Sequence, residues 1–215
     1  MNKNKVTLLA VAALALSGCA HQPKDYSAYK AADPKSILIL PPRNSTPEVE
    51  ATYGFYSNTE SPVAESGYYV LPITLVDEYF KANGLTVADD IQRVDYAKLR
   101  EVFGADAALY INVTDYGTRY FVLGSQAVVT AEARLIDLRT GVELWSGKAT
   151  ANSEEGNNNN QGGLAALLIS ALVKQVVGSV SDQSYSISKM TTVRLLSAKS
   201  PGSLLPGPRS PNYKK

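Results

Sequence analysis

Residues 128–150, VVTAEARLIDLRTGVELWSGKAT, carry the clearest pattern in this sequence. Apolar and polar residues alternate along the first half, which is typical of a β-strand with one buried face. The apolar positions are Val129, Ala131, Ala133 and Leu135, and the polar positions are Thr130, Glu132 and Arg134. Gly141 can supply the positive φ of a bulged turn, so we expect a hairpin loop over DLRTGVEL. The returning strand is expected to place Val142 and Leu144 on one side, and Glu143 and Trp145 on the other.

Two earlier segments predict further strands of the same sheet. Residues 37–40, ILIL, form an apolar run closed by Pro41-Pro42, which is typical of a buried strand that ends at a loop. Residues 108–116, ALYINVTDY, alternate in polarity and predict a half-buried strand. We expect Leu109, Ile111 and Val113 on one face of this strand, and Tyr110, Asn112 and Thr114 on the other.

Helical signals lie between these strands. The first predicted helix is opened by Pro72, carries Ile73, Val76 and Phe80 at helical spacing, and stops at Asn83-Gly84. The second is capped by Asp95, carries Leu99, Val102 and Phe103, and ends at Gly104. Residues 85–90, LTVADD, predict a short strand or turn. The order of elements favours an α/β (α+β) fold, a mixed sheet of about four to five strands with helices packed on it.

Other segments are harder to place. Residues 43–67 read as a long polar loop, which is usually functional or disordered. Tyr53, Phe55 and Tyr56 lie within it, and tyrosine suits contact surfaces, so these three are candidate partner contacts. Aromatic residues that merely flank the core are the alternative. Residues 164–180 follow the linker EEGNNNNQGG and predict an apolar helix, which packs in the core, or against a partner or second copy.

The first residues resemble a bacterial lipoprotein leader. Two lysines precede an apolar run too short to cross a bilayer, which favours a signal peptide. Leu16-Ser17-Gly18-Cys19 looks like a lipobox. The resemblance implies cleavage before Cys19 and attachment of lipid to it, including an acyl chain such as palmitate. Ala20 then favours the outer membrane. We expect a signal peptide over 1–18, a lipidated flexible tether over 19–35, a single domain over 36–197 and a disordered Pro/Gly/Ser-rich tail over 198–215.

Composition argues against several function classes. The chain has 21 basic and 20 acidic residues and no basic block outside its ends, so nucleic-acid binding is not expected. The one histidine, His21, lies in the tether, and the one cysteine is the predicted lipid site. No catalytic residues, metal ligands or cofactor-binding motif are therefore predicted, and we expect no cofactor and no enzyme activity.

The segments ILILPPRNS and ARLIDLRTGVELWSG, behind a lipobox, resemble a group of bacterial envelope lipoproteins. The group includes the curli-secretion lipoprotein, the amino-terminal domain of the Tol-system β-propeller protein, and the lipoprotein activators of penicillin-binding proteins. Most of the mature chain is similar to an outer-membrane lipoprotein family of unknown function, whose meningococcal member is a vaccine candidate. Members are often encoded beside a curli-secretion-like lipoprotein. Only Cys19 carries over from the family as a site residue.

These observations predict an envelope role without catalysis. The chain is expected to be anchored by lipid in the outer membrane and to face the periplasm. There it would act as an interaction or assembly component, with a curli-secretion-like lipoprotein or other envelope lipoproteins as partners. A homo-oligomer is a further alternative. Regulation of a cell-wall synthase is the alternative, and a weak carboxylate hydrolase is a third.

Overall fold

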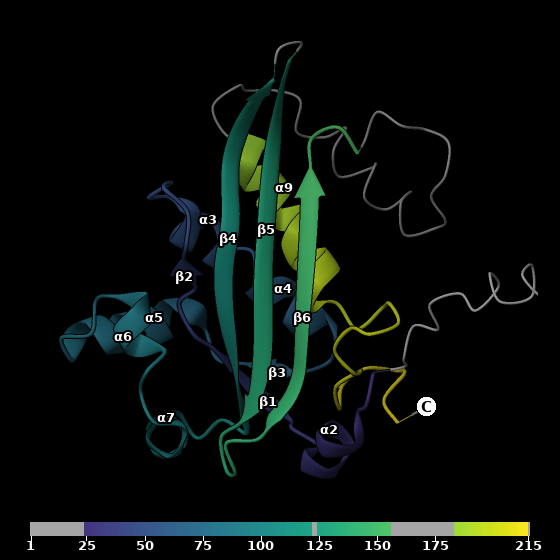
Figure 1. Ribbon diagram of the computed structural model, residues 1–215. Helices are drawn as coiled ribbons and strands as arrows, with labels where there is room; N and C mark the ends of the chain where they lie inside the picture. Colours follow the sequence, from purple (N-terminus) through teal and green to yellow (C-terminus); the bar gives the residue numbers. More distant parts are fainter. Residues whose placement is uncertain (1–23, 122–123, 156–182, 215) are drawn as a thin grey trace, which may run out of the picture.

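The computed structural model describes residues 24–121, 124–155 and 183–214. They form a single domain built on one six-stranded mixed sheet (Figure 1). The strands are β1 (Ser36–Ile39), β2 (Arg43–Asn44), β3 (Tyr69–Val70), β4 (Ala107–Phe121), β5 (Gly124–Asp137) and β6 (Glu143–Asn152). The predicted α/β class is confirmed. The sheet exceeds the expected four to five strands because β2 and β3, with two residues each, are too short to leave a pattern.

The sheet has a parallel part and an antiparallel part. Its strand order is β3-β1-β4-β5-β6, and β2 also pairs with β4. Pairs that involve β1 or β2 are parallel, whereas β4, β5 and β6 run antiparallel to one another. The long β4–β5 hairpin therefore forms the centre, and β6 is the last strand on one side.

Seven helices lie within the described ranges. They are α2 (Ser27–Ala32), α3 (Ala51–Tyr56), α4 (Glu60–Glu65), α5 (Ile73–Ala82), α6 (Ala88–Ile91), α7 (Tyr96–Phe103) and α9 (Gln183–Leu196). The prediction of α5 is confirmed, and so is that of α7, where Asp95 accepts a hydrogen bond from the Ala97 amide at 2.8 Å. Residues 85–90 hold the start of α6 and no strand. The predicted helix over 164–180 lies outside the described residues.

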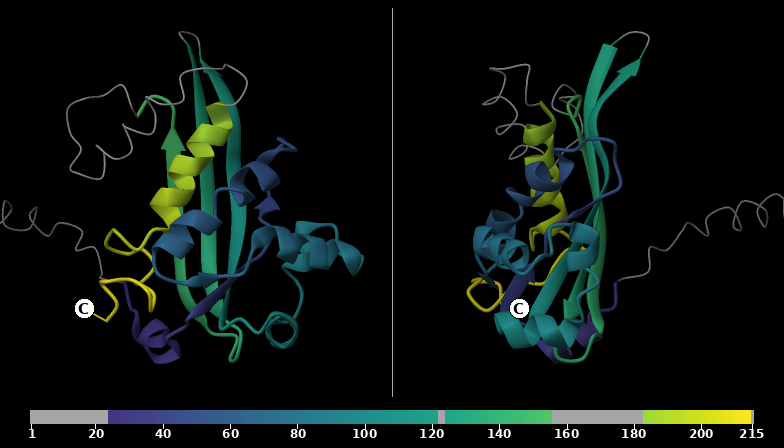
Figure 2. Two further views of the ribbon diagram at one scale, coloured as in Figure 1. Left: turned by 180° about the vertical axis from the view of Figure 1, so that it is seen from behind. Right: turned by 90° about the vertical axis from the view of Figure 1, so that its left-hand side faces the viewer.

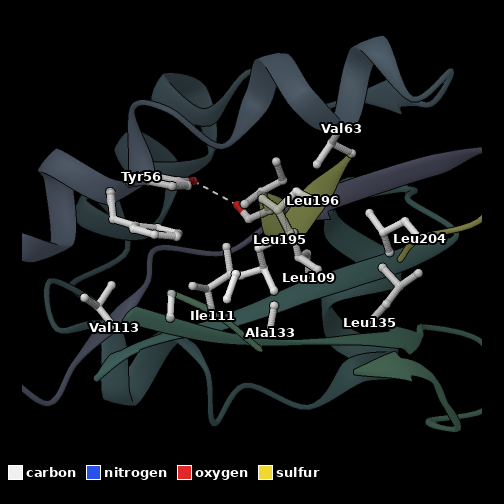
Figure 3. Packing of buried hydrophobic residues seen from close by; sticks show 14 of the residues in the cluster. Tyr56, Val63, Leu109, Ile111, Val113, Ala133, Leu135, Leu195, Leu196 and Leu204 are labelled. Carbon is white, nitrogen blue, oxygen red and sulfur yellow. Dashed lines mark hydrogen bonds between the residues drawn. The ribbon is translucent and has the colours of Figure 1, made fainter. Parts of the chain in front are cut away.

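The main core fills one face of the sheet, beneath α9, α3 and α4 (Figure 2). The predicted inward faces of β4 and β5 are confirmed, since their apolar residues are almost fully buried. Figure 3 shows Leu195 and Leu196 of α9 packed with Leu109 and Leu135 of the sheet. Each fully buried leucine contributes roughly 1.5–3 kcal/mol to folding.

A second, smaller core covers the other face of β1. Leu38 and Leu40 pack there with Phe80 of α5, Ile91 of α6 and Leu99 of α7. Because Ile37 and Ile39 belong to the main core, β1 is buried on both faces. This explains the continuous apolar run ILIL that marks the strand in the sequence.

The returning strand β6 differs from the expected alternation. Leu135 pairs with Trp145 and Ile136 pairs with Glu143, so Leu144 is the extra residue of a β-bulge. The bulge lets both Leu144 and Trp145 enter the main core, where they are 4% and 3% exposed. The prediction that they lie on opposite faces is wrong, because one extra residue breaks the two-residue period. Gly141 has the expected positive φ, at 75°.

Three segments are more ordered than their composition predicts. Residues 43–67 contain β2, α3 and α4, so the expected long loop is wrong. Residues 24–35 are no flexible tether, since α2 forms there and Tyr29 is 2% exposed. Residues 198–214 are no disordered tail, since Leu204 is 2% exposed and the amides of Gly207 and Arg209 bond to the carbonyls of Ser66 and Gly67. In each segment a few apolar or aromatic side chains find a place in the main core, which offsets the entropy of ordering.

Candidate functional site

A cleft of about 330 Å³ opens between α2 and the residues that follow α9. We call it the terminal cleft, because the two described ends of the chain form it. Tyr29, Pro34, Tyr68, Leu205, Pro206 and Tyr213 supply its apolar surface. Lys30, Asp33, Asn212 and Lys214 supply its polar groups. Mostly apolar walls with a few polar groups are typical of ligand sites of this size.

Asp33 ties the two terminal segments together across this cleft. The Tyr213 hydroxyl donates to the Asp33 carboxylate at 2.6 and 2.8 Å, and Lys214 Nζ lies 2.9 Å from Asp33 Oδ2. Hydrogen bonds from Lys214 and Tyr213 lower the pKa of Asp33, and the same contact raises the pKa of Lys214. Asp33 ends α2 in the left-handed region, at φ 45°, a conformation that aspartate tolerates better than most residues.

Tyrosines form the floor of the terminal cleft. The hydroxyls of Tyr29 and Tyr68 lie 2.8 Å apart, and Tyr68 donates to the Leu205 carbonyl at 2.6 Å. Burial raises the pKa of Tyr68 to about 12 and that of Tyr29 well above its ordinary value. Both phenols therefore stay neutral at physiological pH and act as fixed hydrogen-bonding groups.

Lys24 fixes the beginning of the described chain to β6. Its Nζ lies 4.9 Å from the centre of the Trp145 ring and donates a hydrogen bond to the Ser146 carbonyl. The indole Nε1 of Trp145 donates to the Gly202 carbonyl at 2.9 Å. Trp145 thus contacts the segment before α2 and the segment after α9, and it holds both to the edge of the sheet.

The edge strand β6 has a second cation on its outer side. Arg194 of α9 donates to the Thr150 carbonyl and pairs with Glu155, with its Nη2 2.6 Å from Glu155 Oε2. Backbone carbonyls at two points along the edge are therefore occupied by charged side chains.

The residues predicted as partner contacts lie in different environments. Tyr53 is 51% exposed, and Lys81 Nζ lies 5.3 Å from its ring centre. Phe55 is fully buried and Tyr56 is 3% exposed, with its hydroxyl donating to the Ile39 carbonyl at 2.8 Å. Helix α3 separates Tyr53 from Phe55, since residues two positions apart lie on nearly opposite faces of a helix. Tyr56, at the end of α3, is held inward by its hydrogen bond to Ile39. Of the three, Tyr53 is the one available to a partner in this conformation.

The terminal cleft was not predicted from the sequence, because its residues fall in the segments interpreted as tether and tail. Two features of the sequence could have indicated that these segments are ordered. Tyr26 and Tyr29 are three positions apart, as on one face of a helix, and Leu204-Leu205 is an apolar pair among prolines and glycines. Cys19 and His21 lie outside the described residues. Among the residues that the structure describes, no group of three or more His, Cys, Asp and Glu side chains could hold a metal ion.

No helix within the described ranges has both the length and the apolar character that a membrane span requires. Residues 24–209 match the model of a protein family described as "Putative lipoprotein GNA1162-like". The chain is 47% identical over 209 residues to the "Putative lipoprotein NMB1124/NMB1162" of Neisseria meningitidis serogroup B strain MC58, covering 95% of this chain and 96% of the relative.

One solved structure agrees with this match. The crystal structure of lipoprotein GNA1162 from Neisseria meningitidis superposes with a TM-score of 0.55 at 50% identity, covering 68% of this chain and all of that one. The LpoB C-terminal domain from Salmonella enterica is similar at a TM-score of 0.39 and 17% identity, over 54% of this chain and 81% of that one. A likeness at that level says nothing of a shared partner.

Proposed function

Because this chain belongs to the GNA1162-like lipoprotein family, we propose that it is an outer-membrane-anchored lipoprotein that works as a non-enzymatic interaction or assembly component of the envelope. The lipobox Leu16-Ser17-Gly18-Cys19 supports the anchor, and Ala20 after the cysteine supports the outer membrane. Acyl chains on Cys19 would each add about 0.8 kcal/mol per buried methylene, and two or three chains suffice for stable anchoring. The domain would face the periplasm.

The docked position of Lys24 is the observation that carries the proposal. Lys24 contacts Trp145 and Ser146, and it follows Cys19 by five residues. A fully extended chain spans at most about 3.6 Å per residue, so Lys24 lies within roughly 18 Å of an anchored Cys19. The domain would therefore work close to the membrane surface, where other anchored proteins are within reach.

This short linkage supports partners on the same membrane. A curli-secretion-like lipoprotein would be held at the same surface, and we propose it as the partner. A regulator of a cell-wall synthase in the inner membrane would have to reach across the periplasm, and the four residues between Cys19 and Lys24 do not provide that reach. The synthase alternative therefore ranks second.

Tyr53 is the proposed contact residue. Its ring is half exposed, so it offers apolar area and a hydroxyl to a partner, and Lys81, paired with Asp77 at 2.7 Å, lies beside it. Tyrosine provides large contact area at small entropic cost, which is why it is common in interfaces. Phe55 and Tyr56 would support the surface from within, by fixing α3 against the sheet.

Site-specific photo-crosslinking in intact cells tests the proposal. A photoreactive phenylalanine analogue at position 53 is expected to capture a secretion-type envelope lipoprotein, identified by mass spectrometry. The same analogue at position 96 is the control, because Tyr96 is also surface-exposed, at 38%, but lies on α7. Capture of a cell-wall synthase would favour the alternative, capture of a second copy would show a homo-oligomer, and equal products from both positions would contradict a specific contact at Tyr53.

A further inference from the structure

Lys30 brings to the terminal cleft a positive charge that no carboxylate of the cleft lining pairs with. The cleft is lined by two lysines and one aspartate, and Lys214 is already paired with Asp33 at 2.9 Å. The ammonium group of Lys30 forms no hydrogen bond or close ion pair within the described residues. Asp25, on the same segment, accepts hydrogen bonds from the amide and hydroxyl of Ser27 and attracts the Lys30 charge only at longer range. A free ammonium at the rim of a cleft is suited to an anionic group, and to phosphate in particular.

The walls beside Lys30 suit the part of a ligand that carries no charge. Aliphatic surface is presented there by Leu205, Pro206 and Pro34. The hydroxyl of Tyr68 already donates a hydrogen bond to the Leu205 carbonyl. The ring of Tyr29 completes this surface from beneath, with its own hydroxyl bonded to that of Tyr68. A ligand with one anionic group next to an aliphatic chain would match both parts of the cleft.

The cleft also lies near the proposed anchor. Lys30 is eleven residues after Cys19, and the segment between Lys24 and Lys30 is folded onto β6 through α2. The lipid that holds Cys19 would therefore bring the cleft to the headgroup region of the same bilayer. Phospholipid headgroups there combine a phosphate with the first carbons of two acyl chains.

We propose that the terminal cleft binds the headgroup of an anionic phospholipid, with Lys30 contacting the phosphate and Leu205 and Pro206 contacting the glycerol and first acyl carbons. This inference rests on the proposed function for the position of the domain at a membrane. The bound lipid would orient the domain relative to the bilayer, in addition to the covalent anchor.

Short-chain lipids below their micelle concentration test the site without a membrane. The mature-length chain, residues 19–215, is produced without export so that Cys19 stays unacylated. It is titrated with dihexanoyl phosphatidylglycerol, dihexanoyl phosphatidylcholine and glycerol 3-phosphate, and binding is followed by calorimetry and by NMR of the α2 amides. We expect phosphatidylglycerol to bind more tightly than either of the other two probes.

Lys30→Glu is expected to weaken phosphatidylglycerol binding by about fivefold or more, the size expected for one lysine near an anionic surface. Lys189→Glu is the matched control, since Lys189 is an exposed lysine on α9 and does not line the cleft. It should leave binding unchanged. Both variants should unfold at the temperature of the parent chain, because neither side chain forms an ion pair or hydrogen bond within the described residues.

Three results would overturn the inference: equal affinity for the two lipids, glycerol 3-phosphate binding as tightly as phosphatidylglycerol, or unchanged affinity in Lys30→Glu. The second would show a site for a soluble phosphate. Failure here is separate from failure of the proposed function, because the probes need neither acylation of Cys19 nor a protein partner.

Discussion

Tyr29 donates its hydroxyl proton to Tyr68, across 2.8 Å in the core. The direction follows from the next bond, because the single proton of the Tyr68 hydroxyl is given to the Leu205 carbonyl at 2.6 Å. This chain of two hydrogen bonds joins α2, the residue before β3 and the C-terminal segment. Three segments far apart in the sequence are thereby held at one end of the sheet.

Removing the central hydroxyl should cost more than removing the outer one. Tyr68→Phe leaves both the Tyr29 hydroxyl and the Leu205 carbonyl without their partner, so we expect a loss of about 2–3 kcal/mol in the free energy of unfolding. Tyr29→Phe removes one donor to the Tyr68 hydroxyl, which keeps its hydrogen bond to the Leu205 carbonyl. We therefore expect a smaller loss in the free energy of unfolding, about 1 kcal/mol. Urea denaturation measures both, with Tyr185→Phe on α9, 38% exposed, as the control. Equal losses in the two core variants would contradict the assigned direction.

The C-terminal segment should contribute to stability. A chain ending at Ser200 loses the buried Leu204 and the carbonyl acceptors of Tyr26, Tyr68 and Trp145. We expect a destabilisation of about 3 kcal/mol or more, read as a lower thermal midpoint. A chain ending at Ser210 keeps those contacts and loses only the Asp33 contacts of Tyr213 and Lys214. Its thermal midpoint should therefore fall by less. A segment without a fixed structure would give no change in either case.

The contact of Asp33 with Tyr213 and Lys214 should weaken in acid. Since hydrogen bonds lower the pKa of Asp33 in the folded chain, its stabilising contribution is present above the ordinary aspartate pKa of about 3.9 and is lost as pH falls through the lower folded value. Asp33→Asn lacks this titration. The difference in unfolding free energy between parent and variant should therefore shrink between about pH 6 and pH 2.5. A constant difference would show that the carboxylate charge contributes nothing there.

Gly141 should be harder to replace than Gly84, although both have positive φ, at 75° and 81°. A Cβ at position 141 would lie 2.7 Å from Cε1 of Tyr96, whereas a Cβ at position 84 meets nothing within 4 Å. Gly84→Ala measures the backbone strain alone, about 1 kcal/mol. Gly141→Ala adds the clash with the Tyr96 ring, and we expect at least about 1 kcal/mol more by chemical denaturation. Similar losses would show that the ring moves aside freely.

Cys19 should be the residue that carries lipid. Growth with an alkyne-labelled palmitate should label the exported parent chain, and Cys19→Ser should abolish the label and release the protein from the membrane fraction. Ser17→Ala leaves the cysteine in place and serves as the control. Label that persists in Cys19→Ser would place the acyl chain elsewhere.

The sequence predicted the elements whose pattern is local. The apolar run of β1, the alternation in β4 and β5, and the capped helices α5 and α7 each depend on neighbours within a few residues. The bulge at Leu144 could not be predicted, because it depends on the pairing of β5 with β6. The terminal cleft was missed for a similar reason. Tyr29 and Tyr68 become buried only where they meet each other and the partly buried Leu205, and nothing local in the sequence shows that contact.

An edge strand of a sheet, such as β6, can pair with a strand of another molecule, since edge strands present backbone carbonyls and amides on one side. The proposed lipid anchor would make this hazard greater, because it would confine the copies to a plane and raise their local concentration. Lys24 and Arg194 place a positive charge against two edge carbonyls, so a second strand would have to displace both ion–carbonyl contacts before it could pair. Under the proposed anchoring, these two contacts would hinder pairing of crowded copies along β6.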